Sequence, residues 1–214
     1  MPSVCPGYRE RQRRVSCFCY DTLNICLMAL EGLYDAVVHV GDMAYDMAEL
    51  NGHRGDVFME QIEPIASMVP YMTCPGNHEW HYNFSNYKAR FNMPGDDNNN
   101  MFFSFDIGPV HFVSISTEFY YFLNFGLMQV VSQYKWLEAD LAGVDRSLTP
   151  WVVLYGHRPM YCTNTDRDDC TKYQTRTRTG LPLLGWWGLE PLLDKHGVDL
   201  AGENICRGDG DVSV

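Results

Sequence analysis

Six polar residues with ligand or acid–base chemistry follow three short apolar runs of the sequence. They are Asp42 and Tyr45 after residues 35–40, Asn77, His78 and Glu79 after residues 70–74, and His157 after residues 151–155. Carboxylate, phenol, amide oxygen and imidazole together suit Fe, Mn or Zn better than Ca. The set contains no cysteine, so its composition does not favour a soft thiolate site. The pattern predicts a metal centre assembled from three turns.

The first turn has a spacing that could serve two cations. Gly41 permits a sharp change of direction, which lets Asp42 point its carboxylate away from the end of the run. A carboxylate in that position can bridge two cations. Tyr45 lies three residues further on and could return to the same place as a phenolate, which requires a strongly acidic metal such as a ferric ion.

The second turn repeats this arrangement, and the third adds a nitrogen ligand. Gly76 supplies the turn, Asn77 a neutral oxygen, His78 a side chain that could contact the substrate, and His157 an imidazole.

Each of these motifs also has an ordinary structural interpretation. Gly-Asp after a strand is commonly only a turn, Asn-His-Glu can cap a helix, and a histidine at a strand end is commonly structural. The coincidence of three such turns favours the metal centre.

The elements expected around these turns alternate between strands and helices. Helices are predicted at 21–32, 54–68, 129–143 and 185–196, and strands at 35–40, 70–74, 101–106, 110–116, 151–155 and from 198. Pro64 is expected to break or bend its helix, and a long loop is expected between Glu79 and the strand at 101. Strand, helix, strand over residues 35–74 is a βαβ unit, so the fold class is α/β. Ligands bind at the carboxyl edge of such sheets.

Composition excludes several classes of protein. The 214 residues suffice for about one domain, and 46% hydrophobic residues can form a core. The net charge of −11 argues against nucleic acid and anionic membranes as partners, because both are polyanions. No apolar run approaches the roughly 20 residues that span a bilayer. No signal peptide is visible at the start of the chain.

Two features would suit an oxidising compartment. Cys162 and Cys170 flank a polar loop and are predicted to form a disulfide, with two free thiols as the alternative. Asn83-Phe84-Ser85 is a glycosylation sequon, compatible with secretion.

The turns and their surroundings resemble the purple acid phosphatases, a family of the calcineurin-like metallophosphoesterases. The matching blocks are Gly-Asp-Met-Ala-Tyr at 41–45, Gly-Asn-His-Glu at 76–79 and Leu-Tyr-Gly-His at 154–157, with residues 82–91 and 156–162 similar to the animal branch. The tyrosine-containing block distinguishes this family from other metallophosphoesterases. The resemblance covers about residues 32–200.

This resemblance implies a dinuclear centre in which a ferric ion is paired with Fe, Zn or Mn. Asp42 would bridge the two ions, Tyr45 would bind the ferric ion, and Asn77 and His157 would bind the divalent ion. His78 would contact the phosphate or the leaving oxygen as general acid. Two cations can clamp phosphate oxygens and lower the pKa of a bound water to give the attacking hydroxide.

The resemblance also implies a fold, a reaction, a cellular location and an oligomeric state. The fold would be an αββα sandwich of mixed sheets with flanking helices. The function would be acid hydrolysis of small phosphate monoesters by a secreted or lysosomal protein that could form a homodimer.

The family pattern is incomplete at both ends of this chain. Its first ligand, an Asp in G-D-x-G, is missing from residues 8–20, and its final G/A-H-x-H block is missing after Leu200. Asp21 and Glu203 are substitutes that their spacing does not support.

We therefore expect a divergent segment at 1–20, an incomplete catalytic domain at 21–200 and a divergent tail at 201–214, as in a spliced or truncated phosphatase. The alternative function is an inactive relative that binds at most one metal ion or phosphate.

Overall fold

The computed structural model describes residues 32, 34–95, 99–161, 175–181 and 187–203. Its helices are α2 (His53–Ala66), α3 (His81–Arg90), α4 (Met128–Gly143), α6 (Thr175–Thr179) and α7 (Leu189–His196). Its strands are β1 (Val37–Val40), β2 (Tyr71–Cys74), β3 (Phe103–Ile107), β4 (Val110–Ser114), β5 (Trp151–Gly156) and β6 (Leu200–Glu203). Three short 3₁₀ turns are η1 (Asn77–Glu79), η2 (Thr117–Tyr120) and η3 (Leu123–Phe125).

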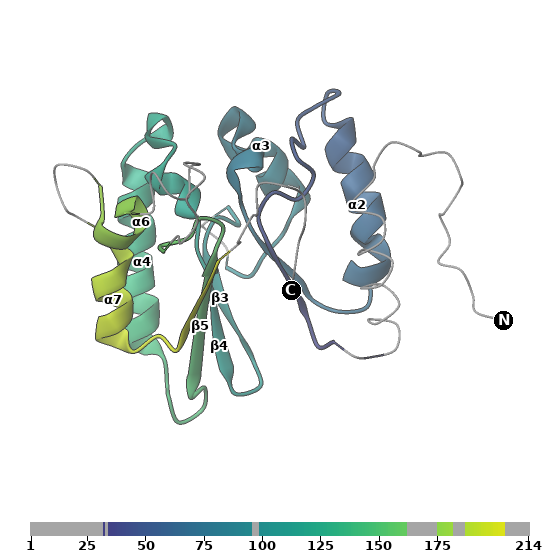
Figure 1. The fold of residues 1–214 in the computed structure, drawn as a ribbon. Coiled ribbons are helices and arrows are strands. Elements are labelled where there is room, and N and C mark those ends of the chain that lie inside the picture. Colours follow the sequence, from purple (N-terminus) through teal and green to yellow (C-terminus); the bar gives the residue numbers. More distant parts are fainter. Residues whose placement is uncertain (1–31, 33, 96–98, 162–174, 182–186, 204–214) are drawn as a thin grey trace.

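The strands form two sheets that lie between layers of helices. β1 and β2 pair in parallel, with Val40 opposite Cys74 at their carboxyl ends. The second sheet has the order β3-β4-β5-β6, in which β3 is antiparallel to β4 and the other pairs are parallel. Figure 1 shows α2 on the outer side of the two-stranded sheet and α4 with α7 on the outer side of the four-stranded sheet. The predicted α/β fold with mixed sheets and flanking helices is confirmed.

Helices α2 and α4 bury side chains at helical spacing, although Tyr134 and Trp136 of α4, which the apolar spacing also predicts to face inward, are only partly buried. In α4 the buried side chains are Val130, Gln133, Leu137 and Leu141, three or four residues apart. In α2 they include Phe58, Ile62 and Ile65. The helix predicted at 54–68 continues through Pro64 and ends at Ala66. Pro64 lies in the last turn, where its missing N–H removes only one helical hydrogen bond.

The loop predicted between Glu79 and residue 101 is wrong, because α3 occupies residues 81–90 of it. The sequence conceals this helix since Tyr82, Asn83 and Phe84 adopt positive φ angles of 53–60° inside it. Tertiary contacts compensate for this unfavourable backbone. Phe84 and Tyr87 are fully buried, and the hydroxyl of Tyr87 bonds with Thr73 of β2 (3.0 Å).

Several predictions fall outside the described residues. They are the helix at 21–32 apart from Gly32, the segment 1–20, the Cys162–Cys170 disulfide, Asp21 and the tail after Glu203. The strand expected from residue 198 begins at Leu200 and continues to Glu203, so β6 includes the first residues of the predicted tail. Within the described ranges, no helix combines the length and apolarity needed to cross a membrane.

Candidate metal centre

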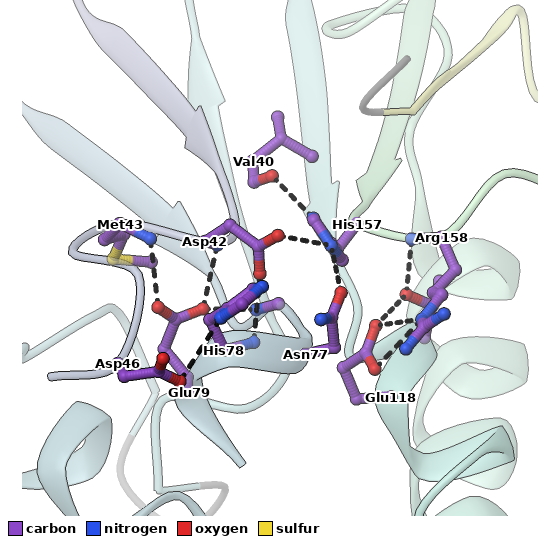
Figure 2. Close-up of polar contacts among 12 residues, drawn as sticks. Val40, Asp42, Met43, Asp46, Asn77, His78, Glu79, Glu118, His157 and Arg158 are labelled. Atoms are coloured by element: carbon purple, nitrogen blue, oxygen red, sulfur yellow. Dashed lines mark hydrogen bonds and ion pairs between the residues drawn. The ribbon is translucent and has the colours of Figure 1, made fainter. Parts of the chain in front are cut away.

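The carboxyl ends of β1, β2 and β5 meet where the two sheets face each other. His157 follows β5, and its Nδ1–H donates to the carbonyl oxygen of Val40, the last residue of β1 (3.0 Å). This bond joins the two sheets at the edge where the sequence predicted a site (Figure 2). It also leaves Nε2 of His157 to face the other two turns.

Oxygen atoms of two other predicted ligands converge on that nitrogen. Nε2 of His157 lies 3.0 Å from Oδ1 of Asn77 and 3.3 Å from Oδ2 of Asp42. Asp42 and His157 are buried, at 6% and 5% exposed. Figure 2 shows the three side chains pointing toward one another from three separate turns. One carboxylate oxygen and one amide oxygen therefore both lie within 3.3 Å of a single imidazole nitrogen.

The two glycines of the turns are required by close contacts. A Cβ on Gly76 would lie 2.3 Å from Oδ1 of Asp42, and a Cβ on Gly41 would lie 2.5 Å from Nδ1 of His157 and 2.8 Å from the Cα of Gly76. Gly41 also has φ 75°, and Asp42 itself has φ 54°. The turns therefore touch each other directly, and only glycine permits this approach.

Glu79 is the site residue to which sequence reasoning gave no role. Its carboxylate is 2% exposed and accepts hydrogen bonds from the backbone N–H groups of Asp42 (2.8 Å), Met43 (2.9 Å) and Gly76 (2.8 Å). Its presence beside His78 was visible in the sequence. Its contact with a turn 36 and 37 positions earlier was not, because no local pattern encodes it.

The charges at the site are coupled. Burial alone would lower the pKa of His157, but its hydrogen bond with Asp42 and the charges of Glu118 and Asp42 outweigh burial and raise the pKa to about 9. Burial opposes ionisation of Asp42, yet the hydrogen bond and charge of His157 lower the pKa of this carboxyl. The imidazole of His157 therefore carries a proton on Nε2, within reach of Oδ1 of Asn77 and Oδ2 of Asp42.

A buried ion pair lies directly behind His157. Nε of Arg158 contacts both carboxylate oxygens of Glu118 (3.0 and 3.1 Å), and the backbone N–H of Arg158 donates to the hydroxyl of Thr117 (2.7 Å). Glu118 is fully buried and Arg158 is 8% exposed. Burial raises the pKa of Glu118 although Arg158 and His157 oppose this shift. The pair fixes the segment that carries the imidazole to η2.

His78 and Tyr45 lie together beside the three converging residues. The backbone N–H of His78 donates to Oδ1 of Asp42 (3.0 Å), and its Nδ1 lies 3.2 Å from Oδ1 of Asp46. The ring of Tyr45 packs against the ring of His78 with centroids 4.6 Å apart. Tyr45 is 46% exposed, in contrast to the buried Asp42 and His157.

The donors fit one cation of borderline character. Ligands about 2.1 Å from an ion lie close to 3 Å from each other when they are neighbours, which matches the distances around Nε2 of His157. In the part of the chain that the structure describes, no three His, Cys, Asp or Glu side chains form a metal-binding group, so the set depends on the amide of Asn77. Cys74 is buried at the end of β2, and burial raises its pKa well above the usual value, which keeps it a neutral thiol.

The fold and these motifs place the protein in a known class. Residues 18–209 match the model of the calcineurin-like phosphoesterases, and the chain belongs to this family. Within the family it is similar to the purple acid phosphatases, as the motifs suggested. It is 55% identical over 172 residues to human acid phosphatase type 7, a match that covers 79% of this chain and 39% of the relative.

Two further similarities support the same placement. The chain is 36% identical over 219 residues to the probable inactive purple acid phosphatase 9 of Arabidopsis thaliana, covering 85% of this chain and 31% of that protein. The solved purple acid phosphatase PPD1 from yellow lupin seeds superimposes with a TM-score of 0.62 at 28% identity, over 85% of this chain and 32% of that one. The chain thus spans less than half the length of these relatives.

Proposed function

We propose that this chain carries the catalytic core of a purple acid phosphatase that hydrolyses small phosphate monoesters. The observation that carries the proposal is the convergence of Asp42 Oδ2 and Asn77 Oδ1 on Nε2 of His157. Three turns from two sheets supply these atoms, and a purely structural histidine needs no such set of metal ligands around one nitrogen.

Asp42, Asn77 and His157 would hold a divalent cation, Fe, Zn or Mn, in place of the Nε2 proton. When bound, such an ion neutralises phosphate oxygens and acidifies a coordinated water. The buried charges favour this exchange. When ionised, the carboxylates of Asp42, Glu79 and Glu118 outnumber the two buried cations Arg158 and protonated His157, so a divalent ion would balance the site.

His78 is the proposed general acid. When its Nδ1–H donates to Asp46, Nε2 remains for the leaving oxygen of the substrate. The bond from its backbone N–H to Asp42 ties the position of the imidazole to that of the carboxylate. Asp46 thereby orients the ring, and His78 would deliver a proton to the departing alcohol.

Tyr45 and Asp42 are the proposed ligands of a second, ferric ion. Support comes from the G-D-x-x-Y spacing and from the packing of the Tyr45 ring against the ring of His78, the proposed general acid. The pairing of a ferric ion with Fe, Zn or Mn, and the bridging role of Asp42, are part of this proposal.

The test is hydrolysis of an aryl phosphate at acid pH, combined with metal analysis of the purified chain. We expect two metal ions per chain, and turnover that Asn77→Ala abolishes. Asn86→Ala, which removes an amide bonded to Arg90 on α3 (2.7 Å), should retain turnover and metal. A chain that holds no metal and shows no turnover would contradict the proposal.

An inactive relative that binds one metal ion or phosphate is the second candidate. The described residues bring three ligands into direct contact, enough for one ion, and a relative 36% identical carries the name of a probable inactive phosphatase. One metal ion per chain with no turnover, lost in Asn77→Ala, would select this function over the first.

We further propose secretion or lysosomal delivery and a homodimer on the basis of the family resemblance, and glycosylation at Asn83 on the basis of the Asn83-Phe84-Ser85 sequon. Asn83 is half-buried in α3, and its Oδ1 is buried without a hydrogen-bond partner. A mobility shift on glycosidase treatment that Ser85→Ala removes would test the glycan, and sedimentation would test the dimer.

A further inference from the structure

Glu79 connects two turns that are distant in the sequence, and we infer that it is a positioning residue for the metal centre. This inference rests on the proposed function. Oε2 accepts from the N–H groups of Asp42 and Gly76, while Oε1 accepts from the N–H of Met43. One carboxylate therefore holds the turn after β1 against the turn after β2 (Figure 2).

These bonds fix the ligand oxygens and not only the backbone. Asp42 sits at φ 54°, a conformation that is unfavourable for a residue with a side chain. Its N–H bond to Glu79 and the bond from the His78 N–H to its Oδ1 hold it there, with Oδ2 directed at His157. Gly76, the other residue tied by Oε2, directly precedes the ligand Asn77.

Only a carboxylate of this length meets all three donors. Both of its oxygens accept from N–H groups, so a glutamine would turn an NH₂ group toward at least one N–H. An aspartate is shorter by one methylene and cannot keep its oxygens in place without moving η1.

Buried charge is also costly, and burial together with the charge of Asp42 raises the pKa of Glu79 despite the three N–H groups. The chain retains a buried anion where an apolar side chain would leave three N–H groups unpaired.

The experiment measures Zn²⁺ affinity of the full chain by competition with a chromophoric chelator, together with its melting temperature. Glu79→Gln should weaken Zn²⁺ binding roughly tenfold to hundredfold, as loss of a group that orients metal ligands does. Glu79→Asp should give a smaller loss.

The matched control is Gln133→Leu. Gln133 is also fully buried and also bonds backbone, since its amide contacts both the N–H (2.8 Å) and the carbonyl (3.1 Å) of Ser116. It should lower the melting temperature without changing Zn²⁺ affinity. If Glu79→Gln and Gln133→Leu change affinity and stability alike, Glu79 is merely structural and the inference is overturned.

A second measurement does not depend on metal. Amide hydrogen exchange of Asp42, Met43 and Gly76 should be slow in the unmodified chain and fast in Glu79→Gln, while amides in β4 stay protected. If the unmodified chain binds no Zn²⁺, the proposed function fails and the role of Glu79 in holding the turns is decided by exchange alone. If these three amides remain protected from exchange in Glu79→Gln, the inferred role of Glu79 is overturned.

Discussion

Two clusters of aspartate and histidine lie at opposite ends of the β-sheets, and they differ in how the oxygens are placed around the imidazole. At the carboxyl ends of β1, β2 and β5, the side-chain oxygens of Asn77 and Asp42, which we propose as metal ligands, approach the same nitrogen of His157. At the other end, near the start of β4, Nδ1 of His111 faces Asp106 (2.6 Å) and Nε2 faces Asp140 (3.1 Å). The oxygens around His111 thus lie on different sides of its ring.

This difference shows that similar residue types can be arranged in different ways around a histidine, and only the arrangement at His157 directs two oxygens at one nitrogen. His111 has two carboxylates and a nearby hydroxyl, Ser104, whereas His157 has one carboxylate, one amide and a backbone carbonyl. The carbonyl of Val40 occupies Nδ1 of His157 and leaves Nε2 for the two oxygens. The His111 cluster instead fastens α4 to the β3–β4 hairpin through Asp140 and Ser104.

The largest expected effect concerns the ion pairs of the two ends. Arg158→Met removes the guanidinium from the fully buried Glu118 and should lower the free energy of unfolding by about 3–5 kcal/mol. Asp106→Asn changes a carboxylate that is 60% exposed beside His111 and should lower it by less than about 1 kcal/mol. Urea denaturation measures the free energy of unfolding of both variants. Equal losses would show that the buried ion pair contributes no more to stability than the exposed one.

The second prediction compares the two histidines directly. His157→Ala removes the nitrogen on which the ligands converge and should weaken Zn²⁺ binding by more than roughly a hundredfold, beyond the loss expected for an orienting residue. His111→Ala should lower the melting temperature and leave Zn²⁺ affinity within about twofold. Chelator competition measures both affinities. A strong loss of Zn²⁺ affinity in His111→Ala would show that the metal binds near His111 and would contradict the proposed site.

The third prediction uses two glycines. Gly76→Ala puts a Cβ 2.3 Å from Oδ1 of Asp42, so the turns must separate, at a cost of about 1–3 kcal/mol in unfolding free energy and with weaker Zn²⁺ binding. Gly143→Ala, at the end of α4, meets no atom within 4 Å and should be neutral or stabilising. Unfolding and Zn²⁺ titration of both variants test whether the site depends on the contact between its turns.

The smallest effect is expected at the His111 end. Ser104→Ala removes the hydroxyl that donates to Asp140 (2.6 Å) and should cost about 1 kcal/mol of unfolding free energy, with no change in Zn²⁺ affinity. Thermal unfolding with and without Zn²⁺ measures both quantities. A Zn²⁺-dependent loss would mean that the two ends are coupled through β4.

Local patterns predicted most of the elements but not every one. The apolar runs before Gly41, Gly76 and His157 are strands, as their β-branched and aromatic residues favour. β1 is nevertheless less buried than its continuous apolar run predicts, since Val38 is 38% exposed. Helix α3 was missed since its first turn has left-handed backbone that no propensity favours, and buried Phe84 and Tyr87 stabilise it. Pro64 was expected to break or bend α2, whereas its place in the last turn lets the helix continue to Ala66.

The candidate site likewise has features that the local sequence predicted and features that depend on the tertiary structure. By itself, the sequence determined the turn motifs that carry Asp42, Asn77, His78 and His157, because glycine followed by a ligand at a strand end is a local feature. Only the tertiary structure decided that Nδ1 of His157 bonds Val40, that two oxygens converge on its Nε2, and that Glu79 ties Asp42 to Gly76. Apart from the bond between Gly76 and Glu79, which lies within one turn, these contacts join residues 37 to 117 positions apart, and packing of the two sheets brings those residues together.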